Sequence, residues 1–274
     1  MKCKYLGLLA SAGFATLLFT ASTANAKPPS LLGSAEDFAV LAGTAVTLTD
    51  SAVIGDVGVD IGDAFTLTTS TILGTLHLGD QVAQHAYDDF LDAYADLAAE
   101  PCGTVLTGTL AGERLVPGVY CFDAAAELTG TLTLVGSSTD TWIFKIGTGG
   151  GGALTGTDFK VVMTSGETCN NNVFWWTAEA ATLTHSVFIG SILAGTSITM
   201  TDTTFDGQAL ATVAVTLTDN TSVSVCGNVS RPAKRPKANE GVGNGVDGNT
   251  PGHDHNGGND DPAFSPGNPG ATNK

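Results

Sequence analysis

Threonines that recur with one spacing are the residues of this chain whose types and positions most clearly suggest a chemical role. The repeated motif is an apolar residue, then Thr, any residue, and Thr or Ser. Because side chains alternate between the two faces of a β-strand, both hydroxyl residues of one copy project on the same side. The copies begin at Val46, Phe65, Leu106, Leu128, Leu154, Leu183, Ile198 and Val215.

Each threonine carries a methyl group and a hydroxyl on a stiff, β-branched stem. Strands stacked about 4.8 Å apart, with the motif threonines about 6.6–6.8 Å apart along each strand, would hold these groups in a flat lattice. A rigid, half-apolar lattice can order adjacent water into an ice-like arrangement, and no threonine pair has Lys or Arg at its outward positions. Threonine also stabilises sheets as an ordinary strand residue, so a purely structural role stays open.

The positions of the motif predict a β-solenoid. The last three copies begin 15 and 17 residues apart, which suits one coil, and the irregular earlier intervals indicate inserted loops. A meander or a sandwich also has short strands, but it does not repeat one motif in every coil.

One segment, Asp80–Ala99, breaks this pattern and is predicted to be an amphipathic helix. Asp80 suits the N-cap, and Pro101 stops the helix. The predicted apolar face, at helical spacing, consists of Val82, Ala86, Phe90, Ala93, Tyr94 and Leu97.

The chain divides into three predicted regions. Residues 1–26 have the positive start, the apolar stretch and the small-residue cleavage site of a secretory signal. Residues 27–230 form the body, and residues 231–274 form a tail rich in Pro, Gly and Asn that we expect to be disordered. No segment is apolar over a length that suits a membrane span, so we expect no membrane insertion.

The charge balance excludes two classes of partner. The formal net charge is −16, and cleavage of the signal would make the protein still more acidic because it removes Lys2 and Lys4. Binding to nucleic acid or to anionic lipid needs clustered basic residues, so we expect neither. The only basic residues of the body are Lys27, Arg114, Lys145 and Lys160.

Four cysteines follow the signal, and an even number in an oxidising compartment suggests two disulfides. Three pairings are possible, and proximity along the chain favours Cys102–Cys121 and Cys169–Cys226. No pair has the close spacing of zinc ligands, and His253-Asp254-His255 is a weak candidate, so we predict no metal site.

An enzyme is the main rival class, because right-handed β-helices include polysaccharide lyases and hydrolases. Their sites need clustered carboxylates or basic residues in a groove. Acids such as Asp50, Asp202 and Asp219 instead fall in predicted turns, where they usually bond to the local backbone. The sequence contains no nucleophile elbow and no phosphate-binding loop, so we predict no catalytic residues and no cofactor.

Several stretches resemble a known family, the microbial ice-binding (antifreeze) proteins. The likeness spans about residues 31 to 227. The stretches that carry it are Leu32–Thr47, Gly55–Val59, Pro117–Phe122, Trp142–Gly147 and Asn172–Trp176, in the order of that family.

The resemblance implies a mainly β fold, a right-handed three-sided β-solenoid with one long α-helix packed alongside. It also implies that the segment after the signal lies beside later coils, not at an end. The family's ice-contact motif is Thr, then Ala or Gly, any residue, and Thr or Asn. Thr44–Thr47 matches it, and Thr196–Thr199 matches it with Ser in second place.

Two other copies depart from the family motif. In one copy, Glu127 occupies the position of the small residue. In the other, Val213 occupies the position of the first threonine. From the repeat and the resemblance together, the predicted ice-contact residues are Thr44, Thr47, Thr49, Thr129, Thr131, Thr155, Thr157, Thr184, Ser186, Thr196, Thr199, Thr201, Thr216 and Thr218.

The resulting functional expectation is a secreted, monomeric ice-binding protein. It would adsorb to the ice crystal surface through a flat threonine-rich face and inhibit ice growth and recrystallisation without turnover. The alternative is a cell-surface or matrix adhesin on the same scaffold with the tail as a spacer, and a glycan-active β-helix enzyme comes third.

Overall fold

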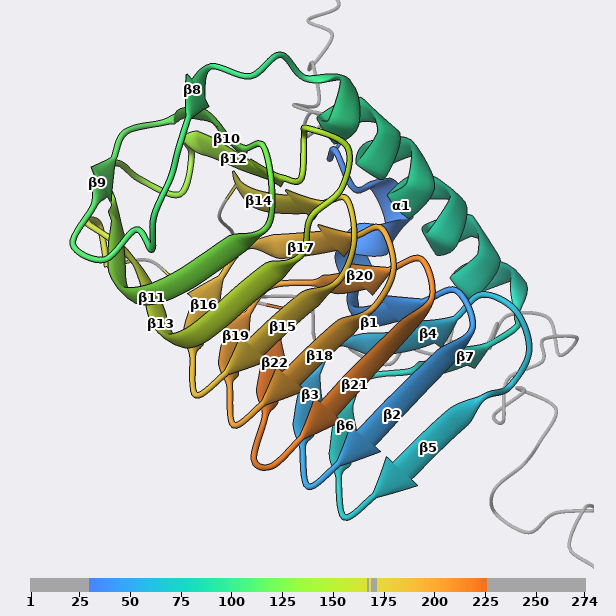
Figure 1. Ribbon diagram of the computed structural model, residues 1–274. Helices are drawn as coiled ribbons and strands as arrows, with labels where there is room; N and C mark the ends of the chain where they lie inside the picture. The colour runs from blue at the N-terminus through green and yellow to red at the C-terminus, as the bar shows by residue number, and fades with distance from the viewer. Residues whose placement is uncertain (1–29, 167, 169–171, 226–274) are drawn as a thin grey trace, which may run out of the picture. The chain divides into compact units, whose positions relative to one another are not determined.

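Short strands that alternate apolar and polar residues wind into a β-solenoid, with one long helix beside it (Figure 1). The structure, a computed structural model, describes residues 30–166, 168 and 172–225. All strand pairs are parallel, and the strands form three faces around one apolar core. The fold class expected from the sequence, a mainly β three-sided solenoid with one long helix, is confirmed.

The first face lies under the helix and is called here the helix-covered face. It is a nine-stranded sheet. In spatial order its strands are β7 (Leu76–Leu78), β4 (Asp56–Val59), β1 (Phe38–Ala42), β20 (Ala209–Ala211), β17 (Ser191–Ala194), β14 (Asn172–Thr177), β12 (Thr141–Ile146), β10 (Gly118–Phe122) and β8 (Thr104–Val105).

The other two faces belong to one sheet that bends at a corner. The part with most motif threonines, called here the threonine face, contains β5 (Phe65–Thr68), β2 (Ala45–Thr49), β21 (Ala214–Thr218), β18 (Ile198–Thr201), β15 (Ala181–Thr184) and the first halves of β13 (Leu154–Met163) and β11 (Ala126–Leu134). The third face contains β6 (Thr71–Leu73), β3 (Ala52–Ile54), β22 (Ser222–Ser224), β19 (Thr204–Asp206), β16 (Val187–Ile189), β9 (Arg114–Leu115) and the second halves of β13 and β11.

The order of the coils in space differs from their order in the chain. Strand β1 lies between β4 and β20, and β2 lies between β5 and β21, so the first coil packs against the last (Figure 1). The expectation that the segment after the predicted signal lies beside later coils is therefore confirmed.

Aromatic rings fill the wide part of the core. The rings of Phe144 and Trp175 stack with centroids 3.9 Å apart, and Phe188 continues the cluster 4.7 Å from Trp175. Trp175 is buried inside the solenoid, whereas Trp176 points to the opposite side and packs against Tyr94 of the helix. This alternation is what strand geometry requires of two consecutive residues.

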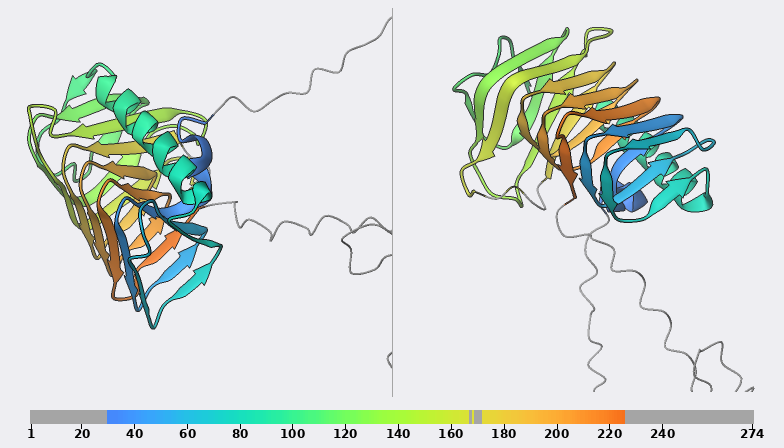
Figure 2. Two further views of the ribbon diagram at one scale, coloured as in Figure 1. Left: turned by 90° about the vertical axis from the view of Figure 1, so that its right-hand side faces the viewer. Right: turned by 90° about the horizontal axis from the view of Figure 1, so that it is seen from below.

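Helix α1 (Gln81–Ala99) runs along the helix-covered face, across its strands (Figure 2). The Asp80 side chain accepts a hydrogen bond from Ala83 N–H, as the N-cap prediction requires. Burial alone would raise the pKa of Asp80, but this bond and contact with His77 lower it below its ordinary value. The prediction for Val82 is wrong, because its side chain is 51% exposed and Ala83 is buried in its place.

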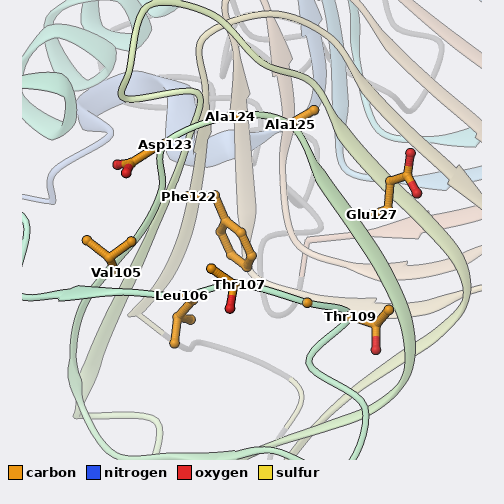
Figure 3. Close-up of a pocket in the computed structure, with 10 residues that line it drawn as sticks. Val105, Leu106, Thr107, Thr109, Phe122, Asp123, Ala124, Ala125 and Glu127 are labelled. Carbon is orange, nitrogen blue, oxygen red and sulfur yellow. The ribbon is translucent and has the colours of Figure 1, made fainter.

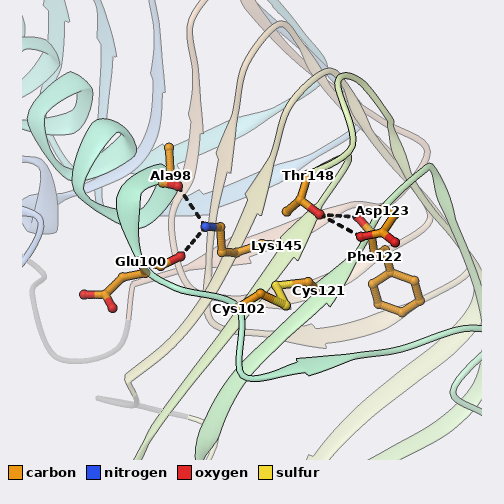
Figure 4. The surroundings of a disulfide bond; sticks show 8 residues. All are labelled: Ala98, Glu100, Cys102, Cys121, Phe122, Asp123, Lys145 and Thr148. Carbon is orange, nitrogen blue, oxygen red and sulfur yellow. Dashed lines mark hydrogen bonds between the residues drawn. A yellow bond between two sulfur atoms is a disulfide. The ribbon is translucent and has the colours of Figure 1, made fainter.

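The far end of α1 is held by a buried cation and a disulfide (Figure 4). Lys145 Nζ donates to the carbonyl oxygens of Ala98 and Glu100 at 2.8 and 2.6 Å. Burial lowers the pKa of Lys145, although the Glu100 carboxylate partly offsets this effect. Cys102 bonds to Cys121, as predicted; Cys169 and Cys226 lie outside the described residues.

The remaining described element is a short 3₁₀-helix, η1 (Gly33–Asp37), which packs against α1. Ser34 N–H and its hydroxyl both donate to the Asp89 carboxylate. The predicted signal (1–26) and tail (231–274), including His253-Asp254-His255, lie outside the described residues.

Candidate functional site

The threonine face carries a column of outward threonines in register across six neighbouring strands. Strand pairing places Thr47 beside Thr66 on one side and beside Thr216 on the other. From Thr216 the register continues without a shift to β13. The members of this first column, in spatial order, are Thr66, Thr47, Thr216, Thr199, Thr182 and Thr155.

A second column runs parallel to the first, two residues further along each strand. Thr49 pairs with Thr68, and Thr218, Thr201, Thr184 and Thr157 follow in register. On β2, β21, β18 and β15 the residues between the two columns, Leu48, Leu217, Met200 and Leu183, are fully buried, whereas Leu67 on the edge strand β5 is exposed. Core packing therefore fixes the strands from below and leaves the threonines outside.

The hydroxyls of these columns are largely uncommitted. Among the described residues, no side chain of the first column hydrogen-bonds to another protein group. In the second column the hydroxyls of Thr201 and Thr218 lie 3.1 Å apart and bond to each other. The lattice thus offers free hydroxyls and methyl groups to water at about 4.8 Å between strands.

A row of small residues lies beside the first column, at the second position of the family motif. Ala45 pairs with Ala214, and Ser197 follows directly before the next strand, β18; its carbonyl oxygen accepts from Ala181 N–H. The first motif position holds Thr44 and Thr196, separated by Val213, and all three are exposed. Thr44 Oγ1 donates to the Val213 carbonyl oxygen at 2.9 Å, so this hydroxyl is already used.

Two predicted outward residues do not belong to the threonine face. Ser186 is 2% exposed and donates to the Thr184 carbonyl oxygen, because strand β15 ends at Thr184 and the chain turns there. His185 occupies that turn with a φ of 49° and is exposed. Thr131 is exposed but pairs with Lys160 on the third face, beyond the corner within β11.

The register also corrects the alignment of two residues of β11. Glu127 pairs with Thr155, so the acid replaces a threonine of the first column and not the small residue beside it. Thr129 is exposed next to a register shift at the edge of the second column, where its N–H donates to the Thr109 carbonyl oxygen. The register is thus regular from Thr66 to Thr155 and breaks at β11.

Three members of the two columns were missing from the predicted set. Thr66 and Thr68 belong to the motif copy Phe65–Thr68, but the predicted contact residues do not include them. Thr182 is absent from the predicted set because the motif is assigned there two residues late, at Leu183–Ser186. The spacing of 17 residues that links Thr201 to Thr218 also links Thr182 to Thr199, and this period could have identified Thr182.

The third face has the same strand ladder without a threonine column. Its outward positions in one register line are Thr71, Ala52, Ser222, Thr204, Val187 and Lys160. A second line includes Ile54, Ser224 and Asp206. Mixed size and charge make this face a poor template for regular water.

A hollow of about 440 Å³ lies at the β11 end of the threonine face (Figure 3). The ring of Phe122 points into it toward Leu106 and Thr107. Asp123 and Glu127 also line it, together with Thr109. The segment Leu106–Thr109 and the start of β11 thus form walls of this hollow at the end of the stack.

The described residues offer little for catalysis or a membrane. They contain no group of three or more His, Cys, Asp or Glu side chains placed to hold a metal ion. Asp50, Asp202 and Asp219 occupy corner turns with φ between 47° and 52°, a conformation that Asp tolerates well. Within the same residues, no helix has the length and apolarity of a membrane span.

Comparison with known proteins points to one family. The sequence profile of the family described as Ice-binding-like matches residues 40–223. The chain is 38% identical over 201 residues to an ice-binding protein of Nostoc sp. (strain HG1), covering 71% of this chain and 72% of that protein. It is 34% identical over 185 residues to an ice-binding protein of Flavobacterium frigoris (strain PS1), covering 61% and 66%.

Solved structures show the same fold. The crystal structure of an ice-binding protein from the Antarctic ascomycete Antarctomyces psychrotrophicus superposes with a TM-score of 0.65 at 32% identity. The superposition covers 71% of this chain and 97% of that one.

Proposed function

Because the chain belongs to the ice-binding-like family, we propose that it is a secreted protein that adsorbs to ice and inhibits ice growth and recrystallisation. The adsorbing surface is the threonine face, with its two columns and the adjoining Thr44 and Thr196. The protein works as a monomer, without a cofactor and without turnover. Secretion follows from the signal pattern of residues 1–26.

The observation that carries this proposal is the unbroken register of the two threonine columns. The helix covers the first face, and the third face mixes Lys160, Asp206 and apolar residues. The threonine face alone has six consecutive strands with the same residue at both outward positions. This regularity favours it as the surface that orders water.

The mechanism is physical adsorption. Stiff β-branched side chains on a rigid sheet hold methyl groups and hydroxyls at fixed spacing. Water between the methyl groups is anchored by the hydroxyls and adopts positions that merge with the ice lattice. The crystal front must then grow around the bound protein, and the resulting curvature opposes further growth.

The direct test is thermal hysteresis and ice recrystallisation inhibition of the mature protein, residues 27–274. An equally acidic β-protein without ice affinity is the control for net charge. We expect hysteresis and inhibition at micromolar concentration, and the protein should partition into slowly growing ice. A sample that is folded by circular dichroism but shows none of these effects would overturn the proposal.

A further inference from the structure

The first threonine column ends in a carboxylate. Strand pairing places Glu127 of β11 directly beside Thr155 of β13, at the position that threonine occupies on the six preceding strands. Its side chain is exposed and makes no hydrogen bond or ion pair with another described residue. The carboxylate of Glu127 therefore faces the solvent at the edge of the threonine lattice.

Threonines also lie beyond Glu127. The carbonyl oxygen of Thr109 accepts from Thr129 N–H, so the segment that contains Thr107 and Thr109 lies one strand further along the stack. Both of these threonines line the hollow together with Glu127 (Figure 3). Glu127 thus interrupts a surface that has threonines on both sides.

A carboxylate is a poor member of such a lattice for two reasons. A charged group holds its own hydration shell strongly and resists its loss. The Glu side chain is also longer and more mobile than Thr, so it projects above the plane of the methyl groups. Water beside Glu127 will therefore follow the charge and not the threonine spacing.

We propose that Glu127 sets the extent of the ice-contact surface at the β11 end and thereby limits the activity of the protein. This inference rests on the proposed ice-binding function of the threonine face. The contact surface ends at Thr155 and Thr157, and the hollow beyond β11 stays outside it.

The test compares Glu127→Thr with the wild-type protein and with a matched control, Glu113→Thr. Glu113 is also exposed, but its carbonyl oxygen accepts from Thr133 N–H on the third face, so the control makes the same charge change away from the contact surface. Glu127→Gln keeps the length and removes only the charge. Denaturant unfolding of each variant verifies the fold.

We expect Glu127→Thr to raise thermal hysteresis at equal concentration roughly twofold, because adsorption strengthens with the contact area. Glu127→Gln should give a smaller rise, and Glu113→Thr should leave hysteresis unchanged. If the wild type is active and a folded Glu127→Thr variant is equally active, this inference is wrong but the proposed function stands. A folded wild type without hysteresis would instead overturn the proposed function, and the inference with it.

Discussion

The helix-covered face and the threonine face are built on the same coils, yet α1 covers the first and leaves the second exposed to solvent. On the first, the outward line of Leu41, Leu210 and Leu193 is fully buried under α1. On the second, the equivalent outward positions hold threonines with exposed methyl groups and hydroxyls. Both faces have the same parallel backbone ladder, so the difference between them lies in their outward side chains.

This difference predicts that the helix-covered face contributes mainly to the stability of the protein and the threonine face mainly to its adsorption to ice. The leucine line on the helix-covered face buries apolar surface between solenoid and helix, which is a stabilising contribution. The threonine columns face outward and make few side-chain hydrogen bonds within the protein, so a substitution there should cost less stability than the loss of a fully buried leucine. Changes on the helix-covered face should therefore alter mainly the free energy of unfolding, and changes on the threonine face should alter mainly adsorption.

The largest expected effect is loss of adsorption on the threonine face. Thr199→Tyr or Thr216→Tyr inserts a ring above the middle of the first column and should abolish most of the thermal hysteresis. The free energy of unfolding should change by less than about 0.5 kcal/mol, as for other surface substitutions. Thr204→Tyr on the third face is the matched control, and unchanged hysteresis in both test variants would contradict the assignment of this face.

The converse change is Leu210→Ala on the helix-covered face. Loss of a fully buried leucine should lower the free energy of unfolding by about 2–5 kcal/mol. Hysteresis per folded molecule, measured near the freezing point, should stay at the wild-type value. A loss of hysteresis in a sample that is still folded would break the separation between the two faces.

A third test addresses the end of α1. The Cys102–Cys121 disulfide links residues 19 apart in sequence, and its removal by Cys102→Ser together with Cys121→Ser should cost about 3 kcal/mol of stability. Denaturant unfolding of this double variant measures the cost. Adsorption should again be unchanged. Reduction of the wild type with dithiothreitol, which would also open the predicted Cys169–Cys226 bond, should cost at least as much stability as the double variant.

The smallest effect is a pH dependence on the helix-covered face. The hydroxyls of Tyr87 and Tyr94 donate to the carbonyl oxygens of Thr212 and Thr177, and burial raises the pKa of both tyrosines above the ordinary value of 10.0. Repulsion from Asp60 adds to the shift at Tyr87.

The folded state therefore holds these two protons more tightly than the unfolded state does. Their stabilisation is complete below pH 10 and declines as the pH rises through the folded pKa values. Lys145, with a lowered pKa, acts in the opposite sense, so the wild type must be compared with the Tyr87→Phe and Tyr94→Phe double variant. Denaturant unfolding at pH 8 and above pH 10 should show a smaller decline for the double variant; an equal decline would contradict the assignment.

The motif threonines show what a local sequence pattern can and cannot predict about the threonine face. Side-chain alternation predicts Thr184 outside whether the motif begins at Ala181 or at Leu183, because the two assignments differ by two residues. The structure distinguishes them: Ser186 lies past the corner and is buried, and Thr182 pairs with Thr199 in the first column. Thr131 lies on the third face for a related reason, because β11 bends around the corner within one strand.

The sequence by itself determined the local features: the alternating strands, the N-cap at Asp80, the helix that Pro101 follows, and the period of the later coils. Each depends on residues close together in the chain, through side-chain alternation, capping and backbone preference. Only the tertiary structure decided the register in which β2 pairs with β21, that Glu127 occupies a position of the first threonine column, and which face α1 leaves bare. These relations depend on register between coils joined by loops of unequal length, and stacking of the core, not local pattern, sets that register.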